Sequence, residues 1–382
     1  FFSAVLCWAS GPSSIRAPRR TRSDMAAQGR PNGVLQWDGT EWAESPAPAT
    51  PPVALPDPLR LATFNILADC FPWTVELAIA SARRTEALIQ RIEALNATIL
   101  ALNEVTPHCL GLLMQSAFVR AKYHVTELPP NPEGCAQPHG CVILSQLPIS
   151  HCCVLDLGRG FSRLGPVVAT FEVAPSVDSL AVRFMVCAMH TKAYQTPRHK
   201  RIRETQIAAA VAFLRARALP YALLGDLNLH YVCEDGVVPD HGLLDCWAET
   251  HFQSGGDQDP GYTFDAAKNA MIPRYIPGES RRMRLDRILV SKNFGFAPVS
   301  PCRLWAQEAV PGAPEVFPSD HFGLFIDLRY DPVGFPAAAE VAERLEANGR
   351  LSLETYEFSH WRFALALVGH AVWLLQRAVG WT

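Results

Sequence analysis

Residues 221–229 read YALLGDLNL, and this stretch decides the fold: an uncharged apolar run ends in a glycine, then come an acid and an amide. The run predicts a short buried strand at residues 222–224. Asp226 and Asn228 are two residues apart, so their side chains point to the same side of an extended segment. In α/β sheets, ligands bind where the carboxyl ends of strands converge, so this strand end is a candidate site.

Three other apolar runs also end in polar residues. Asn65 follows LATF, Glu104 follows ILALN and His190 follows FMVCAM, while the pair Asp320–His321 immediately precedes a further run. Each residue taken singly is ordinary turn chemistry. Together they are residue types that hold a hard cation and a phosphate, so the set predicts one shared site.

The remaining periodicity alternates between strand and helix patterns. Strands are expected at residues 59–66, 98–102, 141–144, 167–173, 184–189, 222–224, 284–290 and 322–328, and helices at 81–96 and 197–218. Strands outnumber helices, and hairpin-length spacings mix with helical crossovers. The pattern therefore predicts an α/β fold with two packed sheets and helices outside them.

Composition divides the chain into three segments. Residues 1–58 are expected to be disordered, with a proline-rich linker over 45–58, and residues 59–330 form the main domain. Residues 331–382 are expected to be a helical appendage. Its uncharged run at 363–376 falls short of the roughly 20 residues that a membrane span needs. We therefore expect a docking or membrane-surface helix there and no stable span.

Charge and cysteine content narrow the function classes. The 34 Lys+Arg against 37 Asp+Glu exclude a polybasic protein, so nucleic-acid contact would need a local patch. The 11 cysteines are scattered without a C-x-x-C pair, which argues against a zinc ribbon or a disulfide framework. We expect a reducing intracellular compartment, with nucleus or cytoplasm favoured. The arginine-rich opening, typical of transit peptides, leaves an organelle open.

Phosphodiester hydrolysis explains the strand-end residues. Negative phosphate oxygens repel an incoming nucleophile, so the site needs a cation and hydrogen-bond donors. Mg²⁺ takes oxygen ligands, often one or two carboxylates with waters and phosphate, and Glu104 beside Asn65 suits Mg²⁺ or Mn²⁺. Asp226 can orient or deprotonate water, and Asn228 can donate to phosphate.

His321 is expected to donate charge-assisted hydrogen bonds to developing negative charge. This requires a carboxylate that keeps the imidazole protonated and oriented. Asp286, in the stretch MRLDRILVS, is the candidate for that role.

The ordered motifs now support a resemblance. They are TFN (63–65), NEV (103–105), MHT (189–191), GDLN (225–228), RLDRI (284–288) and SDHFGLF (319–325). Residues 59–330 resemble the exonuclease–endonuclease–phosphatase superfamily with its deoxyribonuclease I fold. The resemblance implies a four-layer α/β/β/α sandwich and Mg²⁺-dependent attack of water on phosphorus. The implied roles are Glu104, Asn65 and Asp320 at the metal, Asp226 placing water, Asn228 and His321 on phosphate, and His190 as an added electrophilic group.

The carboxyl half is most similar to the tyrosyl-DNA phosphodiesterase 2 family. The matching stretches are LLDCW (243–247), GYTFD (261–265) and FPSDH (317–321). The resemblance implies that Phe264 lies near DNA, and we expect Tyr262, Asn269 and Arg284 as further substrate contacts. Three departures leave the substrate open: the ILAD turn at 66–69 is more like the deadenylases, Asn103 replaces a usual glutamine, and His230 replaces a common arginine.

Two basic clusters are solvated faces or a groove for single-stranded nucleic acid. They comprise Arg198, Lys200, Arg201 and Arg203, and Arg281, Arg282, Arg284 and Arg287.

A tyrosine phenolate has a pKa of ~10, so it leaves phosphorus without a strong general acid, and no such acid is evident in the sequence.

The sequence thus predicts a monomeric Mg²⁺-dependent phosphodiesterase acting on nucleic-acid ends, as a 5′-tyrosyl-DNA phosphodiesterase of DNA repair. An RNA 3′ exonuclease or deadenylase, and a lipid or inositol phosphate phosphodiesterase, are alternatives within the superfamily. A non-catalytic binding module is the alternative from another class. It predicts loss of a metal or water-placing residue, and all of these are present.

Overall fold

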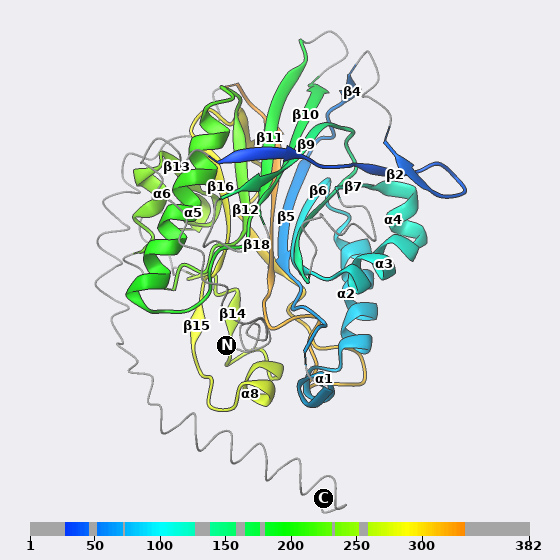
Figure 1. The fold of residues 1–382 in the computed structure, drawn as a ribbon, viewed down its shortest axis with the longest axis vertical. Coiled ribbons are helices and arrows are strands. Elements are labelled where there is room, and N and C mark those ends of the chain that lie inside the picture. The colour runs from blue at the N-terminus through cyan, green and yellow to red at the C-terminus, as the bar shows by residue number, and fades with distance from the viewer. Residues whose placement is uncertain are drawn as a thin grey trace, which may run out of the picture.

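The computed structural model describes residues 27–45, 52–71, 73–126, 138–157, 165–175, 180–230, 234–251 and 259–332. Two large sheets pack face to face, and helices cover their outer faces (Figure 1). The predicted four-layer α/β/β/α sandwich is confirmed. The predicted helical appendage, including the apolar run at 363–376, lies outside the described residues except for 331 and 332.

The first sheet has eight strands and carries Asp226 at the end of a central strand. Its strands in spatial order are β1 (Gln28–Pro31), β9 (Ile149–Asp156), β10 (Val167–Ala174), β11 (Val182–Ala188), β12 (Tyr221–Asp226), β16 (Asp286–Ser291) and β13 (Leu243–Asp245), with β4 (Val53–Ala54) beside β10.

The second sheet has nine strands and carries Asn65 and Glu104. Its strands in spatial order are β17 (Phe296–Pro298), β19 (Gly323–Tyr330), β5 (Leu59–Asn65), β6 (Ile99–Val105), β8 (Gly140–Ser145), β7 (His124–Val125), β2 (Leu35–Trp37) and β3 (Trp42–Glu44), with β18 (Arg303–Trp305) beside β19. A separate ribbon pairs β14 (Phe264–Asp265) with β15 (Arg282–Met283).

Each sheet contains one parallel pair whose strands are joined through a helix. Strands β5 and β6 are connected by α2 (Ser81–Leu95), and β11 and β12 by α5 (Pro197–Arg215). Parallel strands end at the same edge, so each unit delivers two strand ends side by side. This topology places all the polar strand ends of the sequence near one another.

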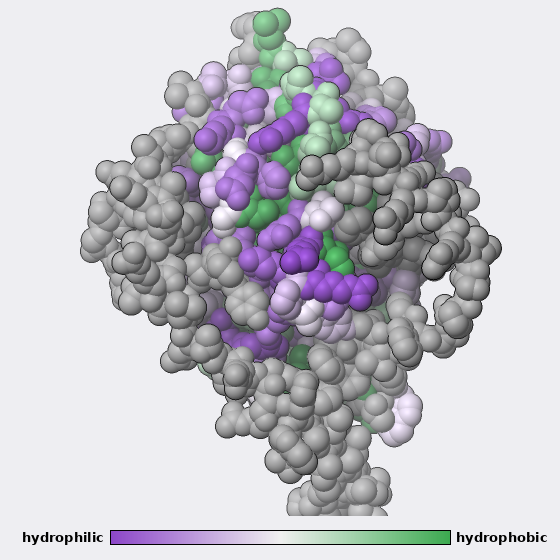
Figure 2. Space-filling model, turned by 60° about the vertical axis from the view of Figure 1, so that its left-hand side comes forward, coloured by the Kyte–Doolittle hydropathy of each residue, from purple (hydrophilic) through white to green (hydrophobic). Residues whose placement is uncertain are grey.

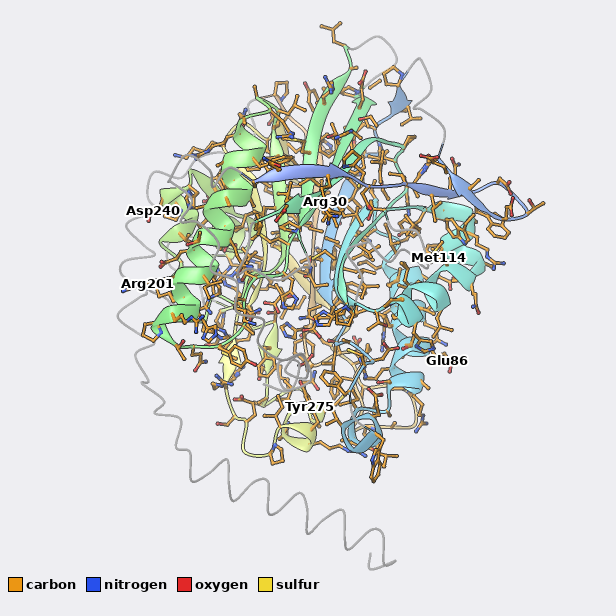
Figure 3. All side chains as sticks on the ribbon, viewed as in Figure 1. Arg30, Glu86, Met114, Arg201, Asp240 and Tyr275 are labelled. Carbon is orange, nitrogen blue, oxygen red and sulfur yellow. The ribbon has the colours of Figure 1, made fainter. Side chains whose placement is uncertain are left out.

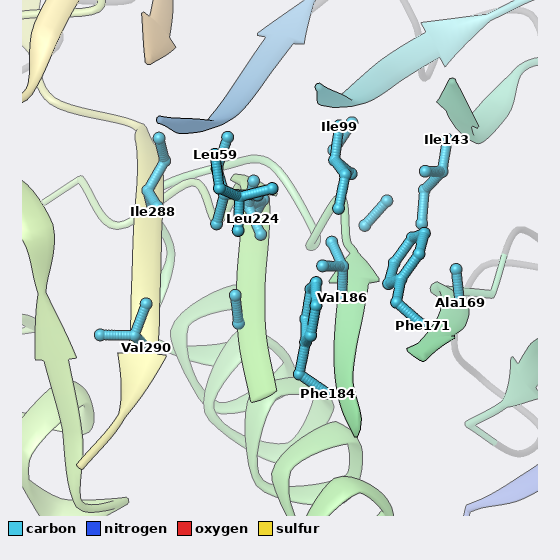
Figure 4. Close-up of a cluster of buried hydrophobic side chains, with 14 of the residues drawn as sticks. Leu59, Ile99, Ile143, Ala169, Phe171, Phe184, Val186, Leu224, Ile288 and Val290 are labelled. Atoms are coloured by element: carbon cyan, nitrogen blue, oxygen red, sulfur yellow. The ribbon is translucent and has the colours of Figure 1, made fainter. Parts of the chain in front are cut away.

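The core between the sheets is apolar (Figure 4). Leu59, Ile99 and Ile143 of the second sheet face Phe184 and Leu224 of the first, and all five side chains are fully buried. These residues alternate along their strands with residues that face the outer helices, as the two-residue period of a strand requires.

Helices complete the outer layers by burying one apolar face each. On the second sheet, Leu88 and Ile92 of α2 pack against Phe64, while on the first, Ile207 and Val211 of α5 pack beneath the strands. The other helices are α1 (Trp73–Ile79), α3 (Pro107–Gln115), α4 (Ala117–Lys122), α6 (Val237–Asp240), α7 (Cys246–His251) and α8 (Met271–Tyr275). None of the helices in the described residues is both long and apolar enough to cross a membrane.

The structure differs from the sequence prediction within residues 1–58. Strands β1, β2 and β4 precede Leu59, and the side chain of Leu35 is buried against the outer layer of the second sheet. Strand β1 is an edge strand with the sequence QGRP, and edges are where a strand tolerates glycine and proline. Short edge strands of this kind lack the apolar alternation that a sequence pattern detects.

Candidate active site

The strand ends of both sheets meet at one place, and an amide joins them. Nδ2 of Asn65 donates to Oε1 of Glu104 at 3.3 Å and to Oδ2 of Asp226 at 3.0 Å. Asn65 and Glu104 belong to the second sheet and Asp226 to the first. Residues from two separate halves of the sequence therefore form one polar cluster, buried at the ends of the strands.

Glu104 reaches this cluster because its strand is irregular. The register between β6 and β8 shifts after Leu102, and Glu104 has a φ of 60°, in the left-handed region that non-glycine residues rarely adopt. Oε2 of Glu104 accepts from the N–H of Ala68 at 3.0 Å. Burial alone would raise the pKa of Glu104, but the imidazoles of His139 and His190 and the Ala68 hydrogen bond together lower it to about 2. The carboxylate is ionised at neutral pH.

Asp226 is held by backbone contacts from both sides. Its N–H donates to Oδ1 of Asn103 at 2.9 Å, and its own Oδ1 accepts from the N–H of Asn228 at 2.9 Å. The preceding residue must be glycine: Gly225 has a φ of 141°, and an added Cβ would lie 1.9 Å from the carbonyl oxygen of Met189. Burial raises the pKa of Asp226, and the nearby Asp286 adds to this, against the influence of His321 and His190.

Two histidines flank the carboxylates on the side of β8 and β11. Nε2 of His190 lies 3.5 Å from Oδ2 of Asp226 and 4.0 Å from Oε1 of Glu104. The ring of His139 lies 6.4 Å from that of His190 between centroids, and its Nδ1 is buried without a hydrogen-bond partner among the described residues. Sequence reasoning missed His139, which precedes β8 in a turn and carries no periodic signal.

His321 and Asp286 form a buried pair. Nδ1 of His321 lies 2.7 Å from Oδ2 of Asp286, so the other ring nitrogen faces Asp226, 3.9 Å from its Oδ2. Burial opposes the charged imidazolium, but Asp286, Asp320 and Asp226 raise the pKa of His321 well above its usual value. The predicted partnership of these two residues is therefore present in the structure, and the surrounding carboxylates favour the charged imidazole.

The other predicted metal and phosphate residues lie in the same cluster but already have protein partners. Oδ1 of Asn65 accepts from the N–H of Leu67 at 3.1 Å, so its amide nitrogen and not its oxygen faces the carboxylates. Nδ2 of Asn228 donates to the Thr191 carbonyl at 3.2 Å. Asp320 accepts from the hydroxyl of Tyr275, which lies on α8 (Figure 3).

Of the residues predicted to contact substrate, the structure buries most. Phe264 packs edge-on against the ring of His321 with centroids 5.5 Å apart, and Asn269 is fully buried and donates to the Ser319 carbonyl at 2.8 Å. Both support the loop that carries Asp320 and His321. Tyr262 remains partly exposed, with the guanidinium of Arg282 above its ring at 4.7 Å.

Arg284 does not occupy the predicted position in a substrate groove. Nη1 of Arg284 donates to Oδ2 of Asp245 at 2.6 Å, and Nη1 of Arg287 donates to the same oxygen at 2.9 Å. Burial alone would raise the pKa of Asp245, but the two guanidinium groups lower it to about 2. These charges are therefore buried and paired inside the fold.

The other basic residues divide between paired and exposed positions. Arg203 is fully buried and donates to Oε1 of Glu234 at 3.0 Å, whereas Arg201 lies on the outer side of α5 (Figure 3). Arg281 and Arg282 hydrogen-bond Glu279 and Asp265. Hydrophilic side chains nevertheless gather over the middle of the face turned forward in Figure 2.

His230 follows Asn228 by two residues and lies beside the site. Both of its ring nitrogens are buried without a hydrogen-bond partner among the described residues. Burial, together with the nearby Arg203, Arg281 and His321, lowers the pKa of His230 to about 3. The imidazole is therefore neutral at physiological pH and supplies no fixed positive charge beside Asn228.

Glu249 on α7 offers a pH-dependent test of the packing around the buried ion pairs. Burial and the charge of Asp245 raise the pKa of Glu249 from 4.5 to about 7. The folded protein thus holds this proton more tightly than the unfolded chain. The resulting stabilisation is present below the unfolded pKa and is lost as the pH rises through about 7.

We expect the melting temperature of the wild type to fall more between about pH 5 and about pH 8 than that of Glu249→Gln, which cannot lose a proton. Calorimetry at the two pH values measures this difference. Glu86→Gln, at an exposed position on α2 (Figure 3), is the control and should behave like the wild type. Parallel pH dependence in wild type and Glu249→Gln would contradict the assignment.

The donor set fits a hard divalent cation and not a closed zinc site. Within the described residues, no group of three or more His, Cys, Asp and Glu side chains is arranged to hold a metal. Mg²⁺ needs no such cage, because it usually binds one or two carboxylates and takes its remaining ligands from water and phosphate. Glu104, whose carboxylate is ionised beside Asn65 and Asp226, is the residue that would hold such a cation.

Comparison with known proteins identifies relatives of this arrangement. Residues 62–321 match the endonuclease/exonuclease/phosphatase family, a span of more than half of the chain and one that includes every strand end in the site. No curated protein sequence matches the chain significantly.

Solved structures share the fold at low sequence identity. An endonuclease/exonuclease/phosphatase from Bacteroides vulgatus has a TM-score of 0.51 and 17% identity, covering 72% of this chain and 100% of that chain. A humanized D. rerio TDP2 with 14 mutations has a TM-score of 0.50 and 16% identity, covering 71% of this chain and 98% of that chain. At such identities the likeness concerns the fold alone.

Proposed function

Because the chain belongs to the endonuclease/exonuclease/phosphatase family, we propose that it is a Mg²⁺-dependent phosphodiesterase acting on the ends of nucleic-acid strands. The proposed substrate is a tyrosyl ester at the 5′ end of single-stranded DNA, which would place the protein in DNA repair. One observation carries the proposal. An ionised Glu104 and a buried Asp226, from different sheets, meet on the amide of Asn65, and His321 lies 3.9 Å from Asp226.

Asp226 is the residue that prepares the water. Its buried carboxylate has a raised pKa, so it accepts a proton more readily than an exposed aspartate does. Attack forms a bond between the water oxygen and phosphorus while the proton passes to Asp226. The bond between phosphorus and the tyrosyl oxygen breaks, and its electron pair stays on that oxygen.

His321 stabilises the negative charge that develops on the phosphate. Asp286 fixes Nδ1, so Nε2 carries the proton that points into the site, and the raised pKa keeps this donor charged. His190, beside both Glu104 and Asp226, is a second donor to the phosphate. A bound Mg²⁺ or Mn²⁺ at Glu104 supplies further positive charge for the non-bridging oxygens.

The leaving group supports the tyrosyl ester among the substrates of the superfamily. A phenolate with a pKa of ~10 departs without proton donation, whereas a ribose oxygen needs a general acid or more metal assistance. In this proposal the imidazoles of His321 and His190 serve the phosphate oxygens, and both ring nitrogens of His230 are buried, so none of these three side chains is assigned to protonate a leaving group.

A substrate panel tests this proposal. The wild type is incubated with a 5′-phosphotyrosyl single-stranded oligonucleotide, a poly(A) RNA and an inositol phosphate, each in Mg²⁺, and the products are separated by chromatography. We expect the tyrosyl oligonucleotide to be hydrolysed at least ~10²-fold faster than the others because only its leaving group needs no acid. Faster trimming of poly(A) would overturn the tyrosyl assignment and favour a deadenylase.

A further inference from the structure

Arg84, on α2, is a buried cation whose hydrogen bonds within the described ranges include none to a carboxylate. Its side chain is 2% exposed. Nη1 donates to the carbonyls of Ile66 and Pro318 at 3.0 and 3.1 Å, and Nη2 donates to the carbonyl of Leu67 at 3.0 Å and to Oγ of Ser81 at 3.2 Å. The hydrogen bonds that Arg84 makes to described residues thus end on uncharged oxygens.

The carbonyls bound by Arg84 belong to two loops of the active site. Ile66 and Leu67 directly follow Asn65, and Pro318 comes shortly before Asp320. The planar guanidinium fork therefore fixes the distance between the loop at 65–68 and the loop at 318–321. The carbonyl of Leu67 reaches the fork because this residue has a φ of 56°, a conformation that non-glycine side chains rarely adopt.

Arg203 provides a natural comparison on the other sheet. It comes from α5 as Arg84 comes from α2, is also fully buried, and donates to the carbonyls of Lys192 and Tyr194 in the loop after His190. Its charge, however, is matched by Glu234, whose Oε1 lies 3.0 Å from Nε. Each of the two strand–helix–strand units thus sends one arginine to its site loop. Among the described residues, Arg203 has a carboxylate at hydrogen-bond distance, whereas the charge of Asp320 acts on Arg84 from further away.

Burying a cation without a nearby carboxylate lowers the stability of the fold, so the presence of Arg84 at this position needs a reason. Arg84 lines the same small pocket as Glu104, and the charge of Asp320 acts on it. The site collects the acids Glu104, Asp226, Asp286 and Asp320 and must then accept an anionic phosphate. In a low-dielectric interior, a fixed positive charge beside this cluster opposes the repulsion among these groups.

We propose that Arg84 is a positioning residue for the hydrolysis: its fork sets the spacing of the Asn65 and His321 loops, and its unpaired charge supports the phosphate between them. The inference rests on the proposed function, since it assigns Arg84 a part in that reaction. It goes beyond the proposed function because it assigns a role to a residue outside the cluster of Glu104, Asp226 and His321.

Two variants separate the fork from the charge. Arg84→Lys keeps the charge and loses the fork, and we expect kcat to fall about tenfold with KM little changed. Arg84→Met loses both, so kcat should fall by about 10²-fold and KM should rise. Arg83→Met, at the exposed neighbouring position, is the matched control and should keep wild-type kinetics. Millimolar methylguanidinium should restore part of the activity of Arg84→Ala.

The outcomes are distinguishable. If Arg84→Lys folds and has the kcat of the wild type, the inference about Arg84 is overturned, while the proposed function is unaffected. If Arg84→Met does not fold, the kinetics of Arg84→Lys alone test the inference. If the wild type hydrolyses none of the substrates, the proposed function fails. Amide hydrogen exchange then tests whether Arg84 holds the two loops in place. Faster exchange at the Leu67 and His321 amides in Arg84→Lys, with Leu223 unchanged, supports it, and unchanged exchange at all three overturns it.

Discussion

Asp226→Asn is expected to lower the rate of phosphodiester hydrolysis by at least ~10³-fold while leaving the melting temperature unchanged or slightly higher. The substitution preserves the shape of the side chain and the hydrogen bond from the N–H of Asn228, but it removes the group that accepts the proton of water. Because burial makes the charged carboxylate unfavourable, losing the charge should not destabilise the fold. Glu104→Gln, at the expected metal ligand, should show the same loss of turnover.

Steady-state kinetics and calorimetry on the same preparations measure both quantities. Asp156→Asn, at the exposed end of β9, is a control and should retain wild-type kinetics. Survival of activity within tenfold in Asp226→Asn would show that another residue prepares the water.

Asp286→Asn should lower turnover by at least ~10²-fold by releasing His321. The carboxylate of Asp286 is fully buried and lies 2.7 Å from Nδ1 of the imidazole. An asparagine at this position cannot hold the imidazole charged as a carboxylate does, and it can present its amide N–H to Nδ1. The donor on Nε2 would then be lost or turned away from the phosphate.

Asp245→Asn is the matched control for this second prediction. Asp245 is likewise buried on the first sheet, but its partners are Arg284 and Arg287. Weakening this cluster should lower the melting temperature clearly and leave kcat almost unchanged, the reverse of the result at Asp286. Loss of turnover in both variants to the same degree would mean that Asp286 only maintains the fold.

Much of the site was predictable because it lies at the ends of buried strands. Apolar runs are visible in a sequence, and the residue that ends each run identifies a strand end. Asn65, Glu104, His190, Asp226 and His321 were all found in this way, and the structure brings them together. The pairing of Asp286 with His321 followed from the chemistry that a charged imidazole requires.

What could not be predicted depends on contacts between distant segments. Asp245, which binds Arg284 and Arg287, lies 39 and 42 residues before them, so local sequence suggested free basic groups. His139 approaches His190 only through the fold. Asn269 looked like a substrate contact, but it is buried beneath the Ser319 carbonyl. The edge strands before Leu59 are too short to show a pattern.

The most direct test of the central claim is release of tyrosine from a 5′-phosphotyrosyl single-stranded oligonucleotide, measured with Mg²⁺ or EDTA for the wild type and for Glu104→Gln. We predict that only the wild type with Mg²⁺ releases tyrosine and leaves a 5′-phosphate on the DNA. Equal release in EDTA, or by Glu104→Gln, would contradict a metal-dependent site at Glu104. Absence of release by folded wild type in Mg²⁺ would contradict the tyrosyl substrate.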